Sequence, residues 1–111
     1  MTRPTSGSSG IVGEQVAARF IERKGATVRA RRVRADGGEI DLVVSDASTV
    51  AAVEVKTTTD GSDPLNAIDD RKVALLGRTS ASLDTPVARL DVVSVRATRD
   101  GVVLRWLKGI D

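Results

Sequence analysis

Hydrophobic residues near the start of the chain recur at steps of three and four positions, which predicts an amphipathic helix over 11–24. The apolar stripe of this helix consists of Val12, Val16, Ala17, Phe20 and Ile21. Gly25 follows at the position where glycine commonly ends a helix. Residues 1–10 are rich in serine, threonine and glycine and show no apolar periodicity. We therefore expect a flexible tail over 1–10 and a single domain over 11–111.

Apolar and polar residues then alternate through three consecutive segments, which is the pattern of half-buried strands. The segments cover 26–34, 39–45 and 49–57. An Asp-Gly-Gly sequence at 36–38 and an Asp-Ala-Ser sequence at 46–48 provide turn residues between them. The pattern predicts a three-stranded antiparallel meander.

A second helix and two further strands are expected in the remainder of the chain. Asp63 and Pro64 form a helix-start signal, and the apolar pattern continues to residue 80 or 82. The buried stripe of this helix would consist of Leu65, Ile68, Leu75 and Leu76. Strands are expected over 90–95 and 102–107, joined by an Arg-Asp-Gly turn. The order helix, three strands, helix, two strands predicts an α/β fold with a central mixed sheet flanked by helices.

Composition restricts the chemistry that the chain can perform. Its 111 residues contain no cysteine and no histidine, which excludes disulfides, thiolate nucleophiles and histidine-dependent triads. Catalysis would have to use carboxylates, lysine, hydroxyls and a hard cation such as Mg²⁺ or Mn²⁺. No apolar run approaches the roughly 20 residues that span a bilayer, and no signal-peptide pattern is present. We therefore expect a cytoplasmic protein without a membrane partner.

The net charge is only +2, but arginines concentrate in the first strand segment. They are Arg29, Arg31, Arg32 and Arg34. Alternation places the first two on one face and the last two on the other, which is typical of an exposed edge strand. The same arginines are candidates for binding nucleic-acid phosphates, because the guanidinium fork matches phosphate oxygens. Phe20 and Trp106 are the only aromatic residues, so recognition of single strands by base stacking is disfavoured.

Charged residues interrupt the apolar pattern of the second and third strands. Asp41 lies in one strand, and Glu54 and Lys56 share a face of the next. Charged groups near a core are costly unless they bind something. Two carboxylates can chelate Mg²⁺ or Mn²⁺, and a lysine can orient a water or stabilise charge on a phosphate. The pattern predicts a metal-dependent site for phosphodiester hydrolysis.

Three further acidic residues have competing explanations. Glu14 is expected in the first turn of the first helix, where a negative charge is favourable without any site. Glu39 shares a face with Asp41 and is either a secondary ligand or a turn residue. Asp91 interrupts the fourth strand, but Arg89 lies on the same face and offers an ion pair. We interpret this last pair as a structural brace.

Five sequence motifs occur along the chain in a characteristic order. They are Gly13-Glu14, Gly38-Glu39-Ile40-Asp41-Leu42-Val43, Val53-Glu54-Val55-Lys56, Lys72 and Arg89-Leu90-Asp91-Val92-Val93. This order resembles that of the YraN-like family of uncharacterised bacterial proteins, over nearly all of 10–107. The family is similar to the restriction-endonuclease superfamily, and most of all to archaeal Holliday junction resolvases.

The resemblance implies a restriction-endonuclease-like core and an active site of the PD-(D/E)xK type. By this resemblance Glu14, Asp41 and Glu54 would be metal ligands and catalytic residues, and Lys56 would be the catalytic lysine. Lys72 resembles a helix residue that lies near the site in some relatives, and it is a further candidate for binding nucleic acid.

The chain departs from the family pattern at three positions. Ala52 replaces a frequent aromatic residue, Thr58 replaces an arginine that often follows the lysine by two places, and Arg32 replaces a common asparagine. None of the three is a metal ligand, so these departures concern contacts with a substrate.

Three hypotheses about function follow. The first is a Mg²⁺-dependent endonuclease acting on structured or double-stranded DNA. The second is a nucleic-acid-binding protein on the same fold with little or no catalysis. The third is a structural module whose acids only pair with Lys56 and Lys72. A homodimer is a candidate assembly by analogy with junction resolvases, with the strand at 102–107 and Trp106 as its candidate interface.

Overall fold

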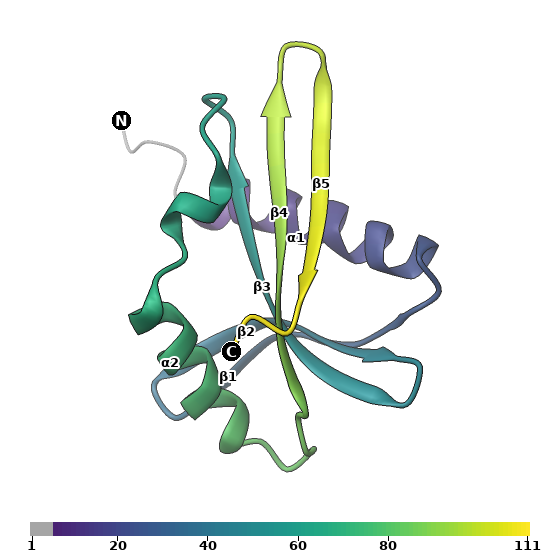
Figure 1. Cartoon of the computed structure of the whole chain (residues 1–111), viewed down its shortest axis with the longest axis vertical. Coiled ribbons are helices and arrows are strands. Elements are labelled where there is room, and N and C mark those ends of the chain that lie inside the picture. Colours follow the sequence, from purple (N-terminus) through teal and green to yellow (C-terminus); the bar gives the residue numbers. More distant parts are fainter. Residues whose placement is uncertain (1–5) are drawn as a thin grey trace.

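The computed structural model of the chain describes residues 6–111 and follows the predicted order of elements (Figure 1). The elements are α1 (Ser6–Arg23), β1 (Thr27–Ala35), β2 (Gly38–Asp46), β3 (Thr49–Thr58), the 3₁₀ turn η1 (Pro64–Ala67), α2 (Asp70–Ala81), β4 (Arg89–Thr98) and β5 (Gly101–Lys108). All five predicted strands are present; β1 is shifted by one residue from its predicted segment, and the other four are longer than predicted.

The five strands form one mixed sheet in the order β1-β2-β3-β4-β5. Neighbouring strands are antiparallel except β3 and β4, which are parallel. A parallel pair needs a crossover connection, and η1 with α2 supplies it. The strands fan apart as the sheet twists, so that the β4–β5 hairpin projects beyond both helices (Figure 1).

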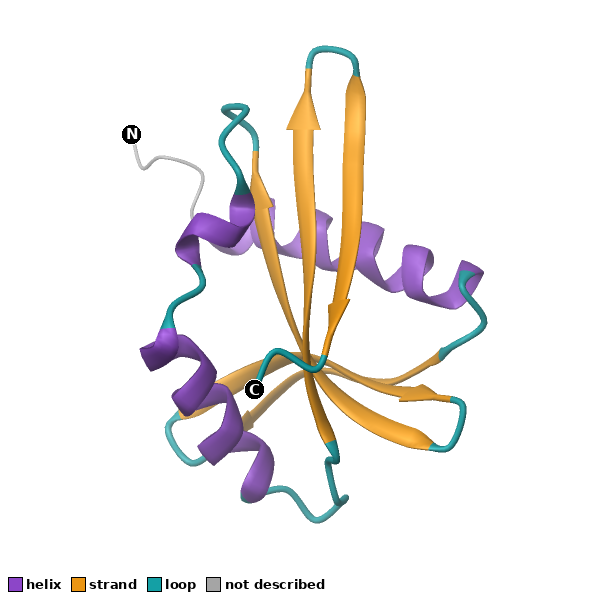
Figure 2. Ribbon diagram, in the orientation of Figure 1, coloured by secondary structure: helices purple, strands orange, loops and turns teal. Residues whose placement is uncertain are grey.

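The helices cover opposite faces of the sheet and define two apolar clusters (Figure 2). On the α1 side, Ala17 and Ile21 are buried with Val53, Val55 and Val93. The α2-side cluster consists of Ile40, Val43, Ala52, Leu76 and Leu90. The predicted alternation of the third strand is therefore confirmed. The mixed sheet flanked by two helices agrees with the restriction-endonuclease-like core that the sequence resemblance implies.

The first helix begins five residues before its predicted start. It covers Ser6–Arg23, so 6–10 of the expected tail are helical, and 1–5 lie outside the described residues. Glu14 consequently lies in the middle of α1 and not in its first turn, which removes the favourable helix-end explanation for this acid. In the described part of the chain, no helix has the length and apolar character needed to cross a membrane.

The prediction of one continuous second helix is wrong. The Asp63 carboxylate accepts from Leu65 N at 3.0 Å and starts η1, and the Asp69 carboxylate accepts from Lys72 N at 3.0 Å and starts α2. Ile68 between them is extended. Two capping aspartates thus begin two separate segments. The buried residues of α2 are Leu76, Thr79 and Ser80, whereas Leu75 is 39% exposed, so its place in the predicted buried stripe is also wrong.

Strand β1 is an edge strand, as predicted, but it does not alternate regularly. Its pairing with β2 shifts register between Val28 and Ala30, and Arg32 has a φ of 53°. These irregularities are typical of a β-bulge and of a locally strained backbone. The strict two-residue period, on which the face assignment of the four arginines depended, is therefore interrupted in β1.

Candidate active site

Strands β2 and β3 separate at Asp41. The paired part runs from Asp46 opposite Thr49, beside the turn, to Leu42 opposite Val53. Asp41, the next residue of β2 away from the turn, is not paired with β3. There the Asp41 Oδ2 accepts a hydrogen bond from Val55 N at 2.8 Å, in place of a backbone carbonyl. Ile40 packs on the α2 side whereas Leu42 packs on the α1 side, so the alternation of β2 is interrupted at this residue. The separation of the strands makes room for a carboxylate between them.

Two glutamates lie close to this aspartate. Carboxylate oxygens of Glu14, Glu39 and Asp41 all lie within 4.8 Å of one another. Glu14 comes from α1, and the other two come from β2. We call these three residues the acid cluster. Three carboxylates at this separation are the donor set that a hard divalent cation prefers, because Mg²⁺ and Mn²⁺ bind oxygen ligands.

Each glutamate of the acid cluster follows a glycine that touches a threonine. A Cβ atom on Gly13 would lie 1.9 Å from Thr57 Oγ1, and one on Gly38 would lie 2.2 Å from Thr79 Oγ1. A side chain at either glycine would force the backbone away from its neighbour. The glycines therefore let α1 approach β3, and β2 approach α2, closely enough to position the cluster.

Glu54 and Lys56 lie beside the acid cluster. Lys56 Nζ is 3.5 Å from Glu54 Oε1, and both side chains are about four-fifths buried. Burial raises the pKa of Glu54, and the nearby charges of Lys56 and Lys72 partly oppose this rise. Burial, followed by the negative charge of Glu54, also raises the pKa of Asp41 from 3.8 to about 7. Glu14 and Glu39 add to the repulsion at Asp41.

The arginines of β1 contact the acid cluster directly. Arg32 Nε donates to Glu14 Oε1 at 3.0 Å, and Arg34 Nε donates to Glu39 Oε2 at 3.2 Å. Arg29 Nη1 donates to Ser45 Oγ at 3.0 Å. Arg31 is exposed. Two of the four arginines predicted to bind phosphate are thus paired with carboxylates, which places them at the site and reduces their free charge.

The structure brings the predicted residues together with one difference. Glu14, Asp41, Glu54 and Lys56 are neighbours, but the three carboxylates whose oxygens all lie within 4.8 Å of one another include Glu39 in place of Glu54. In the sequence, Glu39 was a candidate ligand because it shares a strand face with Asp41. A glutamate that only closes the turn would occupy the same position, so the sequence did not distinguish the two roles. Sequence analysis missed the two glycine–threonine contacts, because a close approach between elements leaves no local pattern.

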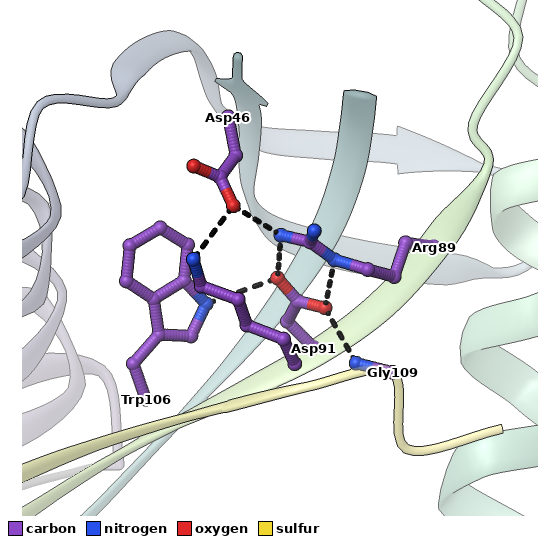
Figure 3. Close-up of polar contacts among 6 residues, drawn as sticks. Asp46, Arg89, Asp91, Trp106 and Gly109 are labelled. Atoms are coloured by element: carbon purple, nitrogen blue, oxygen red, sulfur yellow. Dashed lines mark hydrogen bonds and ion pairs between the residues drawn. The ribbon is translucent and has the colours of Figure 1, made fainter. Parts of the chain in front are cut away.

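Asp91 belongs to a second polar cluster, near the start of β4, where it lies opposite Val53 in the middle of β3 (Figure 3). It is fully buried, and its two carboxylate oxygens accept from Arg89 Nε and Nη2, each at 2.9 Å. Trp106 Nε1 and Gly109 N each donate to the same carboxylate at 2.9 Å. Four hydrogen bonds compensate the buried charge, so the prediction of a structural brace is confirmed.

Asp46 extends this brace to β2. Its Oδ2 lies 2.8 Å from both Arg89 Nη2 and Lys108 Nζ. The hydrogen bonds from Lys108 and then Arg89 lower the pKa of Asp46. Lys108 Nζ also lies 4.2 Å from the centre of the Trp106 ring. Trp106 therefore has an internal role in the brace, which weakens its candidacy as an interface residue.

Comparison with known sequences finds one protein family. A family model described as "Uncharacterised protein family UPF0102" matches residues 13–95. A UPF0102 protein of Paenarthrobacter aurescens is 40% identical over 109 residues, covering 88% of each chain. One of Solibacter usitatus is 40% identical over 111 residues, covering 90% of this chain and 83% of its own. One of Thermotoga maritima is 37% identical over 95 residues, covering 80% and 85%. These names state no activity.

Proposed function

We propose that this chain, which belongs to the uncharacterised protein family UPF0102, is a metal-dependent nuclease that hydrolyses phosphodiester bonds of structured or double-stranded DNA. Membership of this family confirms the resemblance to the YraN-like family. The family name carries no activity, so the proposal rests on the site. The observation that carries it is the meeting of Glu14, Glu39 and Asp41 from two elements, beside Glu54 and Lys56.

The acid cluster suits Mg²⁺ or Mn²⁺, and Glu54 offers a further carboxylate next to it. Such a cation, when bound, polarises a phosphate and acidifies a coordinated water. The crowding of Asp41 supports this assignment, because burial and three neighbouring acids oppose its ionisation. Coordination by the carboxylates would remove that repulsion.

The chain's own residues supply the remaining chemistry. Lys56 shares a strand face with Glu54, and its ammonium can hold a phosphate oxygen as negative charge builds up during attack by water. Glu54 can accept the proton of that water, since burial already raises its pKa. Lys72 acts on Glu54 through its charge. These roles require no histidine or cysteine.

The hypothesis of a purely structural module is less well supported. It requires acids that are satisfied by ion pairs, as Glu54 is with Lys56. Within residues 6–111, however, the Asp41 carboxylate has no cationic partner and accepts a hydrogen bond only from Val55 N. A buried carboxylate without a compensating charge destabilises the fold, so its presence is better explained by a bound cation.

A nucleic-acid-binding protein without catalysis is the second candidate, and one observation favours it. Arg32 and Arg34 already neutralise two of the three acids in the cluster. If these ion pairs persist when metal is present, the carboxylates do not become ligands. This alternative predicts DNA binding that neither needs nor responds to Mn²⁺.

A homodimer and a cytoplasmic location stay predictions. The edge strand β5 exposes Val102 and Val103, at 54% and 51%. Exposed apolar residues on an edge strand suit self-association, because the unpaired backbone can extend a sheet. Sedimentation analysis at several protein concentrations measures the oligomeric state.

The test of the proposed function is a cleavage panel with Mn²⁺ on duplex, flap, four-way junction and single-stranded DNA. Wild-type protein should cleave at least one structured or double-stranded substrate. Lys56→Ala should keep Mn²⁺ binding and lose roughly 10²–10⁴-fold in rate, which is the usual contribution of one charge-stabilising or proton-transferring group. Lys24→Ala, in the exposed turn after α1, is the matched control and should cleave like wild type.

Two results would contradict the nuclease assignment. One is the absence of calorimetric Mn²⁺ binding at millimolar metal. The other is cleavage that survives unchanged in Asp41→Asn, because that activity would belong to a contaminant. DNA binding without cleavage in every arm of the panel would favour the second candidate.

A further inference from the structure

The outer face of α2 carries a row of cations around an exposed leucine. Arg71, Leu75 and Arg78 recur at steps of four and three, so they share one face of the helix, and Lys72 lies beside them. All four residues line one surface pocket together with Ala74 and Asp69, whose carboxylate accepts from Lys72 N at the start of α2. Arg71 and Arg78 are two helical turns apart, which is about 10 Å along the axis.

These cations differ from the arginines of β1 in their partners. Arg32 and Arg34 are paired with Glu14 and Glu39. In the part of the chain that the structure describes, no ion pair joins Arg71, Lys72 or Arg78 to a carboxylate. The α2 face therefore presents positive charge to solvent, whereas much of the β1 charge is already used within the fold.

The α2 face is continuous with the acid cluster. Leu75 lines the pocket of the cations, and it also lines a second pocket formed by the β1–β2 turn, which includes Arg34 and Glu39. Glu39 belongs to the acid cluster. A ligand that lies along α2 and crosses Leu75 therefore reaches the carboxylates.

We propose that Arg71, Lys72, Leu75 and Arg78 form a docking surface for the sugar–phosphate backbone of duplex DNA, which we call the α2 track. The inference rests on the proposed function and adds to it the surface that receives the substrate. Duplex DNA carries one negative charge per roughly 1.7 Å of its axis, so cations spaced along α2 meet phosphates in any register. Leu75, between the two guanidinium groups, offers an apolar contact to the sugars.

The test compares two double variants that remove the same charge from exposed helical arginines. Arg71→Ala with Arg78→Ala removes the two ends of the α2 track. Arg19→Ala with Arg23→Ala removes two exposed arginines of α1, on the other side of the sheet. In each helix one of the two arginines lies in the last turn, so the loss of a favourable charge at the helix C-terminus is common to both variants. Lys72 is retained because its charge acts on Glu54.

Binding to a short fluorescent DNA duplex is measured against salt without divalent metal. The α2 variant should bind more weakly, by roughly tenfold for each arginine. Its slope of log affinity against log salt should be smaller by about 0.9 for each lost phosphate contact. The α1 variant should bind close to wild type, and thermal unfolding should show both variants folded.

Several outcomes would overturn the α2 track. Equal losses in the two double variants would mean that only net charge matters. The same comparison on an RNA duplex and on an acidic protein completes the test, and a loss confined to either of these ligands would assign the surface to another partner. Wild-type protein that does not bind DNA would remove both the track and the proposed function. DNA binding through the track without any cleavage would contradict only the proposed nuclease activity.

Discussion

Two buried aspartates, Asp41 and Asp91, lie on strands of the same sheet in opposite surroundings. Asp91 accepts four hydrogen bonds, two of them from the guanidinium of Arg89. Asp41 accepts one, from Val55 N, and its other close neighbours are acids. The same residue type is thus fully compensated at one site and left uncompensated at the other.

The difference separates structural carboxylates from functional ones. A buried charge with complete hydrogen bonding contributes to the order of the fold, and removing one partner is costly. A buried carboxylate among other carboxylates destabilises the fold until a cation arrives. In the sequence, Asp41 and Asp91 look alike, because each is an acid that interrupts an apolar strand. Only the groups that surround each carboxylate in the structure distinguish them.

The largest expected effect is at the compensated aspartate. Asp91→Asn removes the fully buried one of the two carboxylates that pair with Arg89, and should lower the free energy of unfolding by about 3–5 kcal/mol, measured in urea. Asp100→Asn, in the exposed β4–β5 turn, is the control and should change it little. A loss below about 1 kcal/mol at Asp91 would show that the brace is dispensable.

The stability of the metal-free protein should depend on pH through Asp41. Its pKa is about 7 in the folded protein, against an ordinary value of 3.8, so the folded state binds more protons than the unfolded state between these values. The free energy of unfolding of metal-free protein should therefore fall as the pH rises from about 4 to about 7. Asp41→Asn removes this contribution, and at pH 7 the variant should exceed wild type by an amount on the order of 2–4 kcal/mol. A variant that is less stable than wild type at pH 7 would contradict the pKa assignment.

The close approach that positions Glu14 can be broken at Gly13. Gly13→Ala should lower the free energy of unfolding by about 1–3 kcal/mol, because the new methyl group meets Thr57 Oγ1. The same substitution at Gly10 has open space and should be neutral or stabilising, as alanine usually is in a helix. Calorimetry should also show weaker Mn²⁺ binding by Gly13→Ala. Equal stability of the two variants would mean that α1 shifts without cost.

The smallest expected effect comes from Arg32. Its ion pair with Glu14 is 44% exposed on the arginine side, so it contributes about 0.2–1 kcal/mol. If Mn²⁺ binds Glu14 as proposed, Arg32 competes with it for the glutamate, and Arg32→Ala should lower the Kd for Mn²⁺ by up to about fivefold in calorimetry. Arg31→Ala, on the adjacent exposed residue, should not change it. Weaker Mn²⁺ binding by Arg32→Ala would show that the arginine supports the site and does not compete with metal.

Local sequence signals were sufficient for most of the fold. The Asp-Gly turn at 36–37 predicted the first hairpin, and the alternation at 49–57 placed Val53 and Glu54 on opposite faces. The break at Ile68 was missed because the apolar period continues through it, although the capping aspartate Asp69 was visible in the sequence. The positive φ of Arg32 was not predictable, since nothing local requires it.

The residues of the candidate site that lie on paired strands were predictable from the sequence, and those brought in by tertiary packing were not. Asp41, Glu54 and Lys56 lie on neighbouring strands, so pairing alone brings them close. Glu14 reaches the site only through the packing of α1 on β3, which the sequence motif indicated by resemblance and not by spacing. The place of Glu39 in the acid cluster depends on the separation of β2 and β3 at Asp41, which is a tertiary feature.

The central claim is that Asp41 is uncompensated because it binds a divalent cation. The direct measurement is urea unfolding at pH 7 of wild type, Asp41→Asn and Asp100→Asn, with and without Mn²⁺. Mn²⁺ should stabilise wild type and Asp100→Asn by about 2.7 kcal/mol at a hundredfold excess over Kd, and should leave Asp41→Asn unchanged. Equal stabilisation of all three proteins by Mn²⁺, or of none, would contradict the claim.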